Sequence, residues 1–286
     1  MKTPDPLLKP FVHFDGGADG RIMVGNSLTS YEHADKPDAW ANDVVLGASF
    51  AGVPTGAIPL RHGAKAWIAH EGGPGKDEAG IGGLPLSQRF GVPAAAIATK
   101  TAGLSDGPSL LTGKVSRVNE AARALGVTPG MSGEEAAHLM LKAPPGEPHD
   151  VSSLLDERTH EVASTAKGKV FACWSFSRVT SEHPTDVFCV ASHGAKLMAL
   201  YALRIHPKGL ICNDAGIGLN NTGVEGIYML DEHQIPAATV STDSARIGDP
   251  LSTYNDGVIS AINRAAQAKG VQIGMTAKEA ASLMLD

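Results

Sequence analysis

The sequence predicts an α/β protein made of two homologous βαβαβ halves, each with a mainly parallel sheet. Three apolar runs in the second half carry this prediction, at 187–191, 209–213 and 237–242, and a polar or glycine-rich segment follows each. Matching runs in the first half lie at 44–48, 66–70 and 94–98. Apolar runs of strand length, separated by helix-length segments, are typical of buried parallel strands in βαβ units.

The chain aligns with itself when it is shifted by 143 positions. Residues 43–109 then match 186–252 without a gap, with 19 identities in 67 columns. After one inserted residue, 113–141 match 257–285 with 16 identities in 29 columns. Two copies of this length indicate a duplicated domain, because solenoid repeats are only about 20 to 50 residues long.

A proline-rich stretch at 143–150 has the composition of a linker. We therefore expect a first domain at 1–150 and a second at 151–286, related by pseudo-twofold symmetry. The first 20 residues are rich in Pro and Gly, and we expect an arm that is loosely ordered or covers an edge strand. The active cleft is expected between the halves or above the second sheet.

Three hydroxyl residues stand three positions before a glutamate, the spacing of a capping box: Ser132 with Glu135, Thr222 with Glu225, and Thr276 with Glu279. Two of these pairs begin the last helix of each half. Those helices are the best-matched part of the two copies, so we expect them to pack the halves together or to form a subunit interface. A homo-oligomer follows as an expectation.

Composition bounds the partners and the compartment. With 24 basic and 30 acidic residues and no long run of either sign, neither nucleic acid nor an anionic membrane is expected as a partner. The N-terminus lacks the apolar core of a signal peptide, and no stretch reaches the roughly 20 apolar residues of a membrane span, so we expect a cytoplasmic protein. Cys173, Cys189 and Cys212 fall in predicted strands without CxxC spacing, which favours buried, reduced thiols.

Ligands of open parallel sheets bind beyond the carboxyl ends of the strands, and this rule selects the candidate residues. The expected catalytic residues are Ser192, His193, Lys196, Asp214 and Asp243. The expected substrate-binding residues are Asn213, Gly216, Gly218, Thr242 and Arg246, together with His70 and Glu71 of the first half. Each of these side chains could equally cap a helix or satisfy backbone groups at a strand end.

The segment from Ser192 to Lys196 is the most suggestive cluster. If Ser192 begins a helix, Lys196 at i+4 shares its face, and His193 lies beside the positive end of the helix dipole. A hydroxyl with Lys or His nearby is the minimum for an activated nucleophile. The alternative is an N-cap serine, a surface lysine and a partly buried histidine. The first copy has Ser49 without either basic group, so this chemistry is assigned to the second half.

Two glycine-rich turns, at 71–83 and 214–223, could bring backbone N–H groups against an anionic or amide-bearing ligand. The alternative is a pair of sharp turns that need positive φ. Neither turn is a Walker A loop or a GxGxxG fingerprint at the first strand, so no nucleotide or other cofactor is expected. The 11 histidines form no HxH or HExxH pair at these strand ends, so no catalytic metal is expected either.

The function predicted from these features is hydrolysis of an amide or related C–N bond in a small polar or anionic metabolite. Ser192 would be the nucleophile or would position water, with His193 or Lys196 as the base. The amides of Gly216 and Gly218 would form the oxyanion site. Two alternatives stay open: a cofactor-free isomerase or lyase with a Lys or His base, and a non-catalytic protein that binds a small ligand.

Overall fold

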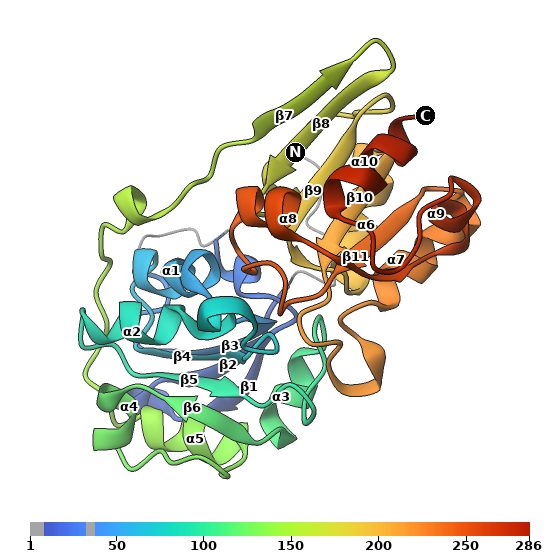
Figure 1. Ribbon diagram of the computed structural model, residues 1–286. Coiled ribbons are helices and arrows are strands. Elements are labelled where there is room, and N and C mark those ends of the chain that lie inside the picture. Colours follow the sequence, from blue (N-terminus) through green and yellow to red (C-terminus); the bar gives the residue numbers. More distant parts are fainter. Residues whose placement is uncertain (1–8, 33–37) are drawn as a thin grey trace. The chain divides into compact units, whose positions relative to one another are not determined.

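The computed structural model describes residues 9–32 and 38–286 and contains two six-stranded sheets (Figure 1). The first sheet has the strand order β1 (Phe11–Asp15), β2 (Arg21–Gly25), β3 (Val44–Phe50), β4 (Ala66–His70), β5 (Ala94–Ile97), β6 (Val115–Val118). The second has the order β7 (His160–Thr165), β8 (Gly168–Cys173), β9 (Val187–His193), β10 (Gly209–Asn213), β11 (Ala237–Val240), β12 (Ile259–Ile262). In both sheets the four inner strands are parallel and the two outer strands are antiparallel to their neighbours.

The predicted α/β class with mostly parallel sheets is confirmed, and the two halves are similar in strand order and pairing. All the apolar runs named above are inner strands. The prediction omitted the four outer strands because these are partly or fully exposed, so they carry no continuous apolar run. β1 lies in the segment expected to be a loose arm, yet it forms a strand, and all five of its residues are exposed. Residues 1–8 of that arm lie outside the described residues.

Ten α-helices and several short 3-10 helices connect the described strands. The α-helices of the first half are α1 (Val53–Arg61), α2 (Gly83–Gln88), α3 (Gly107–Thr112), α4 (Glu120–Ala124) and α5 (Gly133–Met140). Those of the second half are α6 (Lys196–Ile205), α7 (Glu225–Met229), α8 (Pro250–Asp256), α9 (Arg264–Ala268) and α10 (Ala277–Leu285). The 3-10 helices are η2 (Gly17–Asp19), η3 (Leu28–Tyr31), η4 (Lys76–Ile81), η5 (Ser152–Leu154), η6 (Phe176–Arg178), η7 (Leu219–Asn221) and η8 (Leu230–His233).

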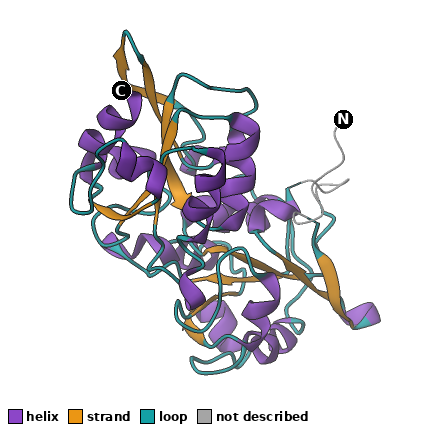
Figure 2. Cartoon of the chain, turned by 90° about the vertical axis from the view of Figure 1, so that its right-hand side faces the viewer, coloured by secondary structure: helices purple, strands orange, loops and turns teal. Residues whose placement is uncertain are grey.

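Helices cover both faces of each sheet. In the first half α1 and α2 lie on one face, and α3, α4 and α5 lie on the other (Figure 1). In the second half α8, α9 and α10 share one core with the sheet, and α6 and α7 share a second core with it. Helices lie on both sides of its strands (Figure 2). The final helices α5 and α10 each pack into the core of their own half, at Met140 and Met284 for example. Their similarity is therefore explained by packing on equivalent sheets.

Two of the three expected capping boxes are present. The hydroxyls of Ser132 and Thr276 accept the backbone N–H of Glu135 and Glu279, whose carboxylates bond back to the cap residues. The third expectation is wrong, because α7 begins at Glu225 with Val224 as its cap residue, and no side chain caps it. The Thr222 hydroxyl instead donates to the Leu219 carbonyl at 3.0 Å, a local turn contact that competes with capping.

Asn119 and Asn263 occupy matching positions in the two halves, each as the cap residue of a short helix. The Asn119 Oδ1 atom accepts the N–H groups of Ala122, in its own helix, and of Ala94, the first residue of β5. Each asparagine thus ties a helix start to the entry of an inner strand. Both side chains are buried, so these hydrogen bonds are not exposed to competition from water.

The three cysteines are free thiols buried in the second half, as expected. Burial raises the pKa of Cys173 to about 12 and holds the pKa of Cys189 and Cys212 well above the ordinary value. These thiols are therefore neutral at physiological pH. In the described part of the chain, no helix is long and apolar enough to cross a membrane.

Contacts between residues divide the chain into two compact units, and the second unit includes a short segment from the first half of the sequence. The first unit runs up to Gly72 and continues from Gly80 to Leu155. The second unit contains Asp156–Asp286 together with Gly73–Ala79. A seven-residue piece of the first half thus belongs to the second unit, and we call this piece the strap.

Candidate functional site

The candidate residues of the second half lie along one edge of its sheet. The neighbouring parallel strands β9, β10 and β11 end at His193, Asn213 and Val240. Their carboxyl ends therefore meet at the same edge, where a ligand site is expected in a sheet of this kind. Ser192 and Asp214 stand at this edge, and Thr242 follows two residues after β11.

Ser192 belongs to a strand and not to a helix. β9 continues to His193, and α6 begins only at Lys196 with Ala195 as its cap residue. Ser192 and Lys196 therefore do not share a helix face, and the i, i+4 argument for the pair is wrong. The Lys196 side chain is exposed, whereas Ser192 is half-buried and His193 is buried.

Ser192 differs from its aligned counterpart in how its hydroxyl is used. Ser49 is buried at the end of β3, and its Oγ atom accepts the Leu28 backbone N–H at 3.1 Å. The Ser192 hydroxyl makes no hydrogen bond to any of the described residues. The first half therefore uses its serine to hold a neighbouring segment, and the second half leaves the aligned hydroxyl available.

Asp214 acts as a tie between two strand ends. Its Oδ1 atom accepts the backbone N–H groups of Gly216 and Thr242, both at 3.0 Å. These bonds join the end of β10 to the end of β11. The amide of Gly216 is therefore already engaged, and of the two expected oxyanion donors only the Gly218 amide has no acceptor in the described part of the chain.

Asn213 is also a structural residue. Its Oδ1 atom accepts the Ala215 N–H at 2.8 Å, and its Nδ2 atom donates to the Ala245 carbonyl at 3.2 Å. Because the side chain is fully buried and bonded at both ends, it is not free to bind a substrate.

His70, the counterpart of Asn213 in the first unit, likewise accepts the backbone N–H two residues further on. Its Nδ1 atom accepts the Gly72 N–H at 3.0 Å, so the ring proton lies on Nε2, which is 3.3 Å from the Thr99 carbonyl. The ring is fully buried, and this burial lowers the pKa of His70 to about 4. His70 is thus a neutral histidine with both nitrogen atoms in use, and not a free acid or base.

Glu71 repeats in the first unit the role of Asp214. Its Oε1 atom accepts the Thr99 backbone N–H at 2.7 Å and the Thr99 hydroxyl at 2.9 Å. The Ser116 hydroxyl donates to Oε2. The carboxylate found at this position in both halves therefore holds adjacent strand ends together.

The glycine-rich turn after β10 has an unusual backbone. Ala215, Gly216, Ile217 and Gly218 are four consecutive residues with positive φ, at 48°, 70°, 72° and 74°. The need for positive φ is therefore confirmed for this turn. Ile217 is β-branched and 39% exposed, and such a residue at positive φ costs of order 1–3 kcal/mol. Strain of this kind is found preferentially where a loop contacts a ligand.

The strap lies against the end of β11. The Lys76 backbone N–H donates to the Thr242 carbonyl at 2.9 Å. The Lys76 Nζ atom lies 3.0 Å from an Asp256 carboxylate oxygen and 3.3 Å from the Ser244 carbonyl. Two of these contacts are with the loop that carries the substrate-binding candidates after β11, so the strap covers part of the predicted site.

Arg246 is paired with the strap as well. Its Nε atom lies 2.7 Å from Asp77 Oδ2, and its guanidinium is also 3.7 Å from Asp249. The residue expected to orient an anionic substrate therefore already contacts two carboxylates. Asp243, the other charged candidate of this loop, is exposed, and its backbone N–H donates to the Ser241 hydroxyl at 3.2 Å.

We expect Gly75→Ala to release the strap. Gly75 has φ 70°, and a Cβ atom there would meet the Thr242 hydroxyl and lie 2.6 Å from the Thr242 carbonyl oxygen. The substitution should lower the free energy of unfolding by about 1–3 kcal/mol more than the matched control Gly91→Ala. Gly91 has φ 69° with nothing within 4 Å, so its substitution carries the backbone strain without the clash.

The measurement is urea unfolding together with amide hydrogen exchange. The Lys76 amide should exchange faster in Gly75→Ala, because its acceptor is the Thr242 carbonyl. Equal stability of the two variants, with the Lys76 amide still protected, would contradict the packing described here.

Sequence reasoning missed Trp174, which directly follows β8 at the same edge as Ser192. The three apolar runs that predicted the second sheet do not include β8, so the rule on strand ends did not select the residue that follows it.

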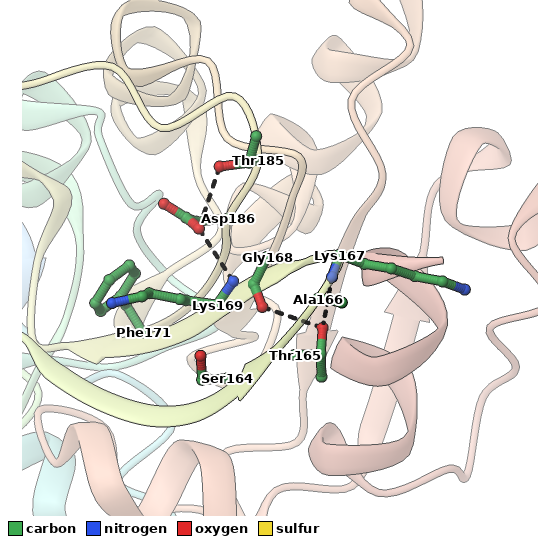
Figure 3. A pocket seen from close by; sticks show the side chains of 9 residues that line it. All are labelled: Ser164, Thr165, Ala166, Lys167, Gly168, Lys169, Phe171, Thr185 and Asp186. Atoms are coloured by element: carbon green, nitrogen blue, oxygen red, sulfur yellow. Dashed lines mark hydrogen bonds between the residues drawn. The ribbon is translucent and has the colours of Figure 1, made fainter.

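A surface pocket of about 520 Å³ lies at the turn of the β7–β8 hairpin, and none of the predicted site residues lines it (Figure 3). Lys167 and Lys169 point in opposite directions there, so their charges do not converge on one ligand. The Lys169 side chain is instead paired with Glu161 at 2.6 Å. Among the described residues, no three His, Cys, Asp or Glu side chains are grouped as a metal site.

Comparison of the chain with protein-family models, with curated proteins and with solved structures found no match.

Proposed function

We propose that the protein is an enzyme that hydrolyses an amide or related C–N bond in a small polar or anionic metabolite, with Ser192 as the nucleophile. One observation carries the proposal. Ser192 stands at the carboxyl end of an inner parallel strand with its hydroxyl unengaged among the described residues, whereas the aligned Ser49 is committed to the Leu28 amide. Strand ends of this kind are where α/β sheets bind and transform ligands.

The proposed reaction has two steps. The Ser192 oxygen forms a bond to the carbonyl carbon while a base, His193 or Lys196, accepts the hydroxyl proton. The C–N bond then breaks, and the amine leaves with that proton. Water cleaves the resulting ester, which releases the acid and restores the serine. The Gly218 amide is the proposed donor to the oxyanion, since the Gly216 amide is bonded to Asp214.

The test is covalent labelling of the folded protein with a fluorophosphonate, followed by peptide mass spectrometry. We expect a single adduct at Ser192, absent from Ser192→Ala and retained in Ser49→Ala. A panel of small amides and ureas should show turnover that falls by at least about 10³-fold in Ser192→Ala. Native protein that neither forms the adduct nor cleaves any member of the panel would overturn the proposal.

A specific observation favours one alternative, a protein that binds a small ligand without transforming it. Asn213, Asp214 and Glu71, three of the predicted polar residues, are engaged in structural hydrogen bonds. This leaves few groups free for chemistry at the strand ends. Saturable ligand binding without label or turnover would support this reading. Solvent deuterium entering recovered substrate would instead indicate a cofactor-free isomerase or lyase.

We also propose that the two halves arose by duplication of one domain. The matching strand orders support this, as do two lysines aligned at the same offset. Lys65 Nζ donates to the Leu141 carbonyl at the end of its unit's last helix, and Lys208 Nζ donates to the equivalent Leu285 carbonyl. The pseudo-twofold relation of the halves stays a prediction.

A further inference from the structure

The three tryptophans of the chain differ in the use of their indole N–H groups. Trp40 donates to the Tyr31 carbonyl at 3.0 Å, and Trp67 donates to the Ser87 hydroxyl at 2.8 Å. Trp174 is only 3% exposed, and its Nε1 atom is buried without an acceptor among the described residues. A buried indole N–H normally finds a partner, so an exception of this kind requires an explanation.

The residue at the matching position of the first half is not a tryptophan, so the fold itself does not require an indole there. Sheet register pairs Gly25 with Gly47 and Cys173 with Val190, so the residue after β2, Asn26, corresponds to Trp174. Asn26 Oδ1 accepts the Gly107 N–H at 2.9 Å.

The second half has lost this tie on both sides. The residue aligned with Gly107 is Pro250, which has no N–H to donate, and the asparagine is replaced by Trp174. An indole N–H cannot accept a hydrogen bond, so it does not substitute for the lost contact. The donor at Trp174 is therefore a new group at this strand end.

The position of Trp174 relates it to the proposed site. β8 and β9 are parallel neighbours in which Cys173 pairs with Val190. Trp174 therefore follows β8 at the edge where Ser192 stands near the end of β9. The guanidinium carbon of Arg178 lies 5.1 Å from the centre of the Trp174 ring, and the same guanidinium is paired with a Glu157 carboxylate oxygen at 3.1 Å.

We propose that Trp174 is a ligand-recognition residue, whose indole N–H donates to a carboxylate oxygen of the molecule bound at the strand ends of β8 and β9. An anionic acceptor makes a stronger hydrogen bond to an N–H donor than a neutral one does. This inference deepens the proposed function by naming a carboxylate in the substrate, and it rests on that proposal only for the location of the site. Because the Nε1 atom is closed to solvent, binding must displace part of the segment at 174–178.

The experiment follows the three indole N–H signals of ¹⁵N-labelled protein by NMR, assigned with Trp→Phe variants. Malonate is the probe, and malonamide is its neutral control. We expect a saturable downfield shift of the Trp174 signal with malonate alone, and faster amide exchange at 174–178. Trp174→Phe should weaken malonate binding by about tenfold or more.

Stability provides the second measurement. Trp174→Phe and Trp67→Phe remove the same buried ring atoms, but Trp174→Phe breaks no hydrogen bond to the described residues, so its urea midpoint should fall less than that of Trp67→Phe. Trp67→Phe breaks the bond to Ser87, so its midpoint should fall while malonate binding is kept. If Trp174→Phe lowers the urea midpoint as much as Trp67→Phe does, the indole N–H of the native protein is already bonded to an ordered water. The proposal is then overturned.

An absence of any malonate shift at Trp174 up to the solubility limit would also overturn it. Ser192→Ala should retain the shift, because recognition does not need the nucleophile. Failure of the hydrolase proposal would therefore leave this result in place, and the two failures can be told apart.

Discussion

Acidification from pH 7 to 4.5 is expected to cost the fold up to ~3 kcal/mol through a single residue, His70. The unfolded imidazole takes up a proton near pH 6.5, whereas burial lowers the pKa of His70 to about 4 in the folded chain. Between these values the unfolded state binds more protons, so stability falls as the pH falls. The contribution is fully present above pH 6.5 and is lost towards pH 4, at 1.36 kcal/mol for each unit of the shift.

Asparagine at position 70 is the matched test, because the chain itself places Asn213 in the equivalent role. In Asn213 the Oδ1 atom accepts an i+2 amide, as His70 Nδ1 does with Gly72. We expect His70→Asn to fold and to lose most of the change in unfolding free energy between pH 7 and 4.5, measured by urea unfolding at each pH. A native-like pH dependence in His70→Asn would show that other groups cause the acid sensitivity.

Asn263→Ala is expected to be among the most destabilising substitutions of a polar side chain. The Oδ1 atom of Asn263 accepts two backbone N–H groups, and the Nδ2 atom donates to two backbone carbonyls. The partners are Ala237 and Ala266 for Oδ1, and Ile227 and Ile235 for Nδ2, at 2.9–3.0 Å. Each buried group left without a partner costs about 1–3 kcal/mol, so we expect a loss on the order of 4 kcal/mol. This is a large part of the roughly 5–15 kcal/mol that stabilises an ordinary domain.

Two further variants make this test specific. Asn263→Asp keeps both acceptor contacts but places a buried carboxylate oxygen against the Ile227 and Ile235 carbonyl oxygens, so its loss should be at least as large. Asn119→Ala should be nearly as damaging in the first unit, where the side chain has three backbone partners. The measurement is the free energy of urea unfolding. A change below about 1 kcal/mol in Asn263→Ala would mean that water replaces the side chain without penalty.

Six inner strands could be predicted from the sequence because nearly all of their residues are buried: β3, β4, β5, β9, β10 and β11. β4 and β10 are buried at every position, and their bounds were correct to the residue. β1 has the opposite character, with Phe11 46% exposed, and its place in a Pro- and Gly-rich segment favoured a loose arm. Strands could therefore be predicted from the sequence where burial restricts their residues to apolar types.

The site was only partly predictable, since the sequence does not show which polar side chains are already bonded. Asn213 and Asp214 were correctly placed at strand ends, yet each is engaged with nearby backbone amides. Ser192 was expected to begin a helix, but β9 extends two residues beyond its apolar run. The pair Asp77–Arg246 joins residues 169 positions apart, a separation at which sequence patterns carry no information.

The strap also has a consequence for dissecting the protein at the level of its gene. A polypeptide that starts at Asp156 would contain every strand of the second sheet but not Lys76 and Asp77, the residues with which Asp256 and Arg246 pair. Cutting the reading frame at the linker would therefore yield a fragment with a missing piece. Recombination could exchange the two halves as independent modules only if residues 73–79 were transferred together with the second unit.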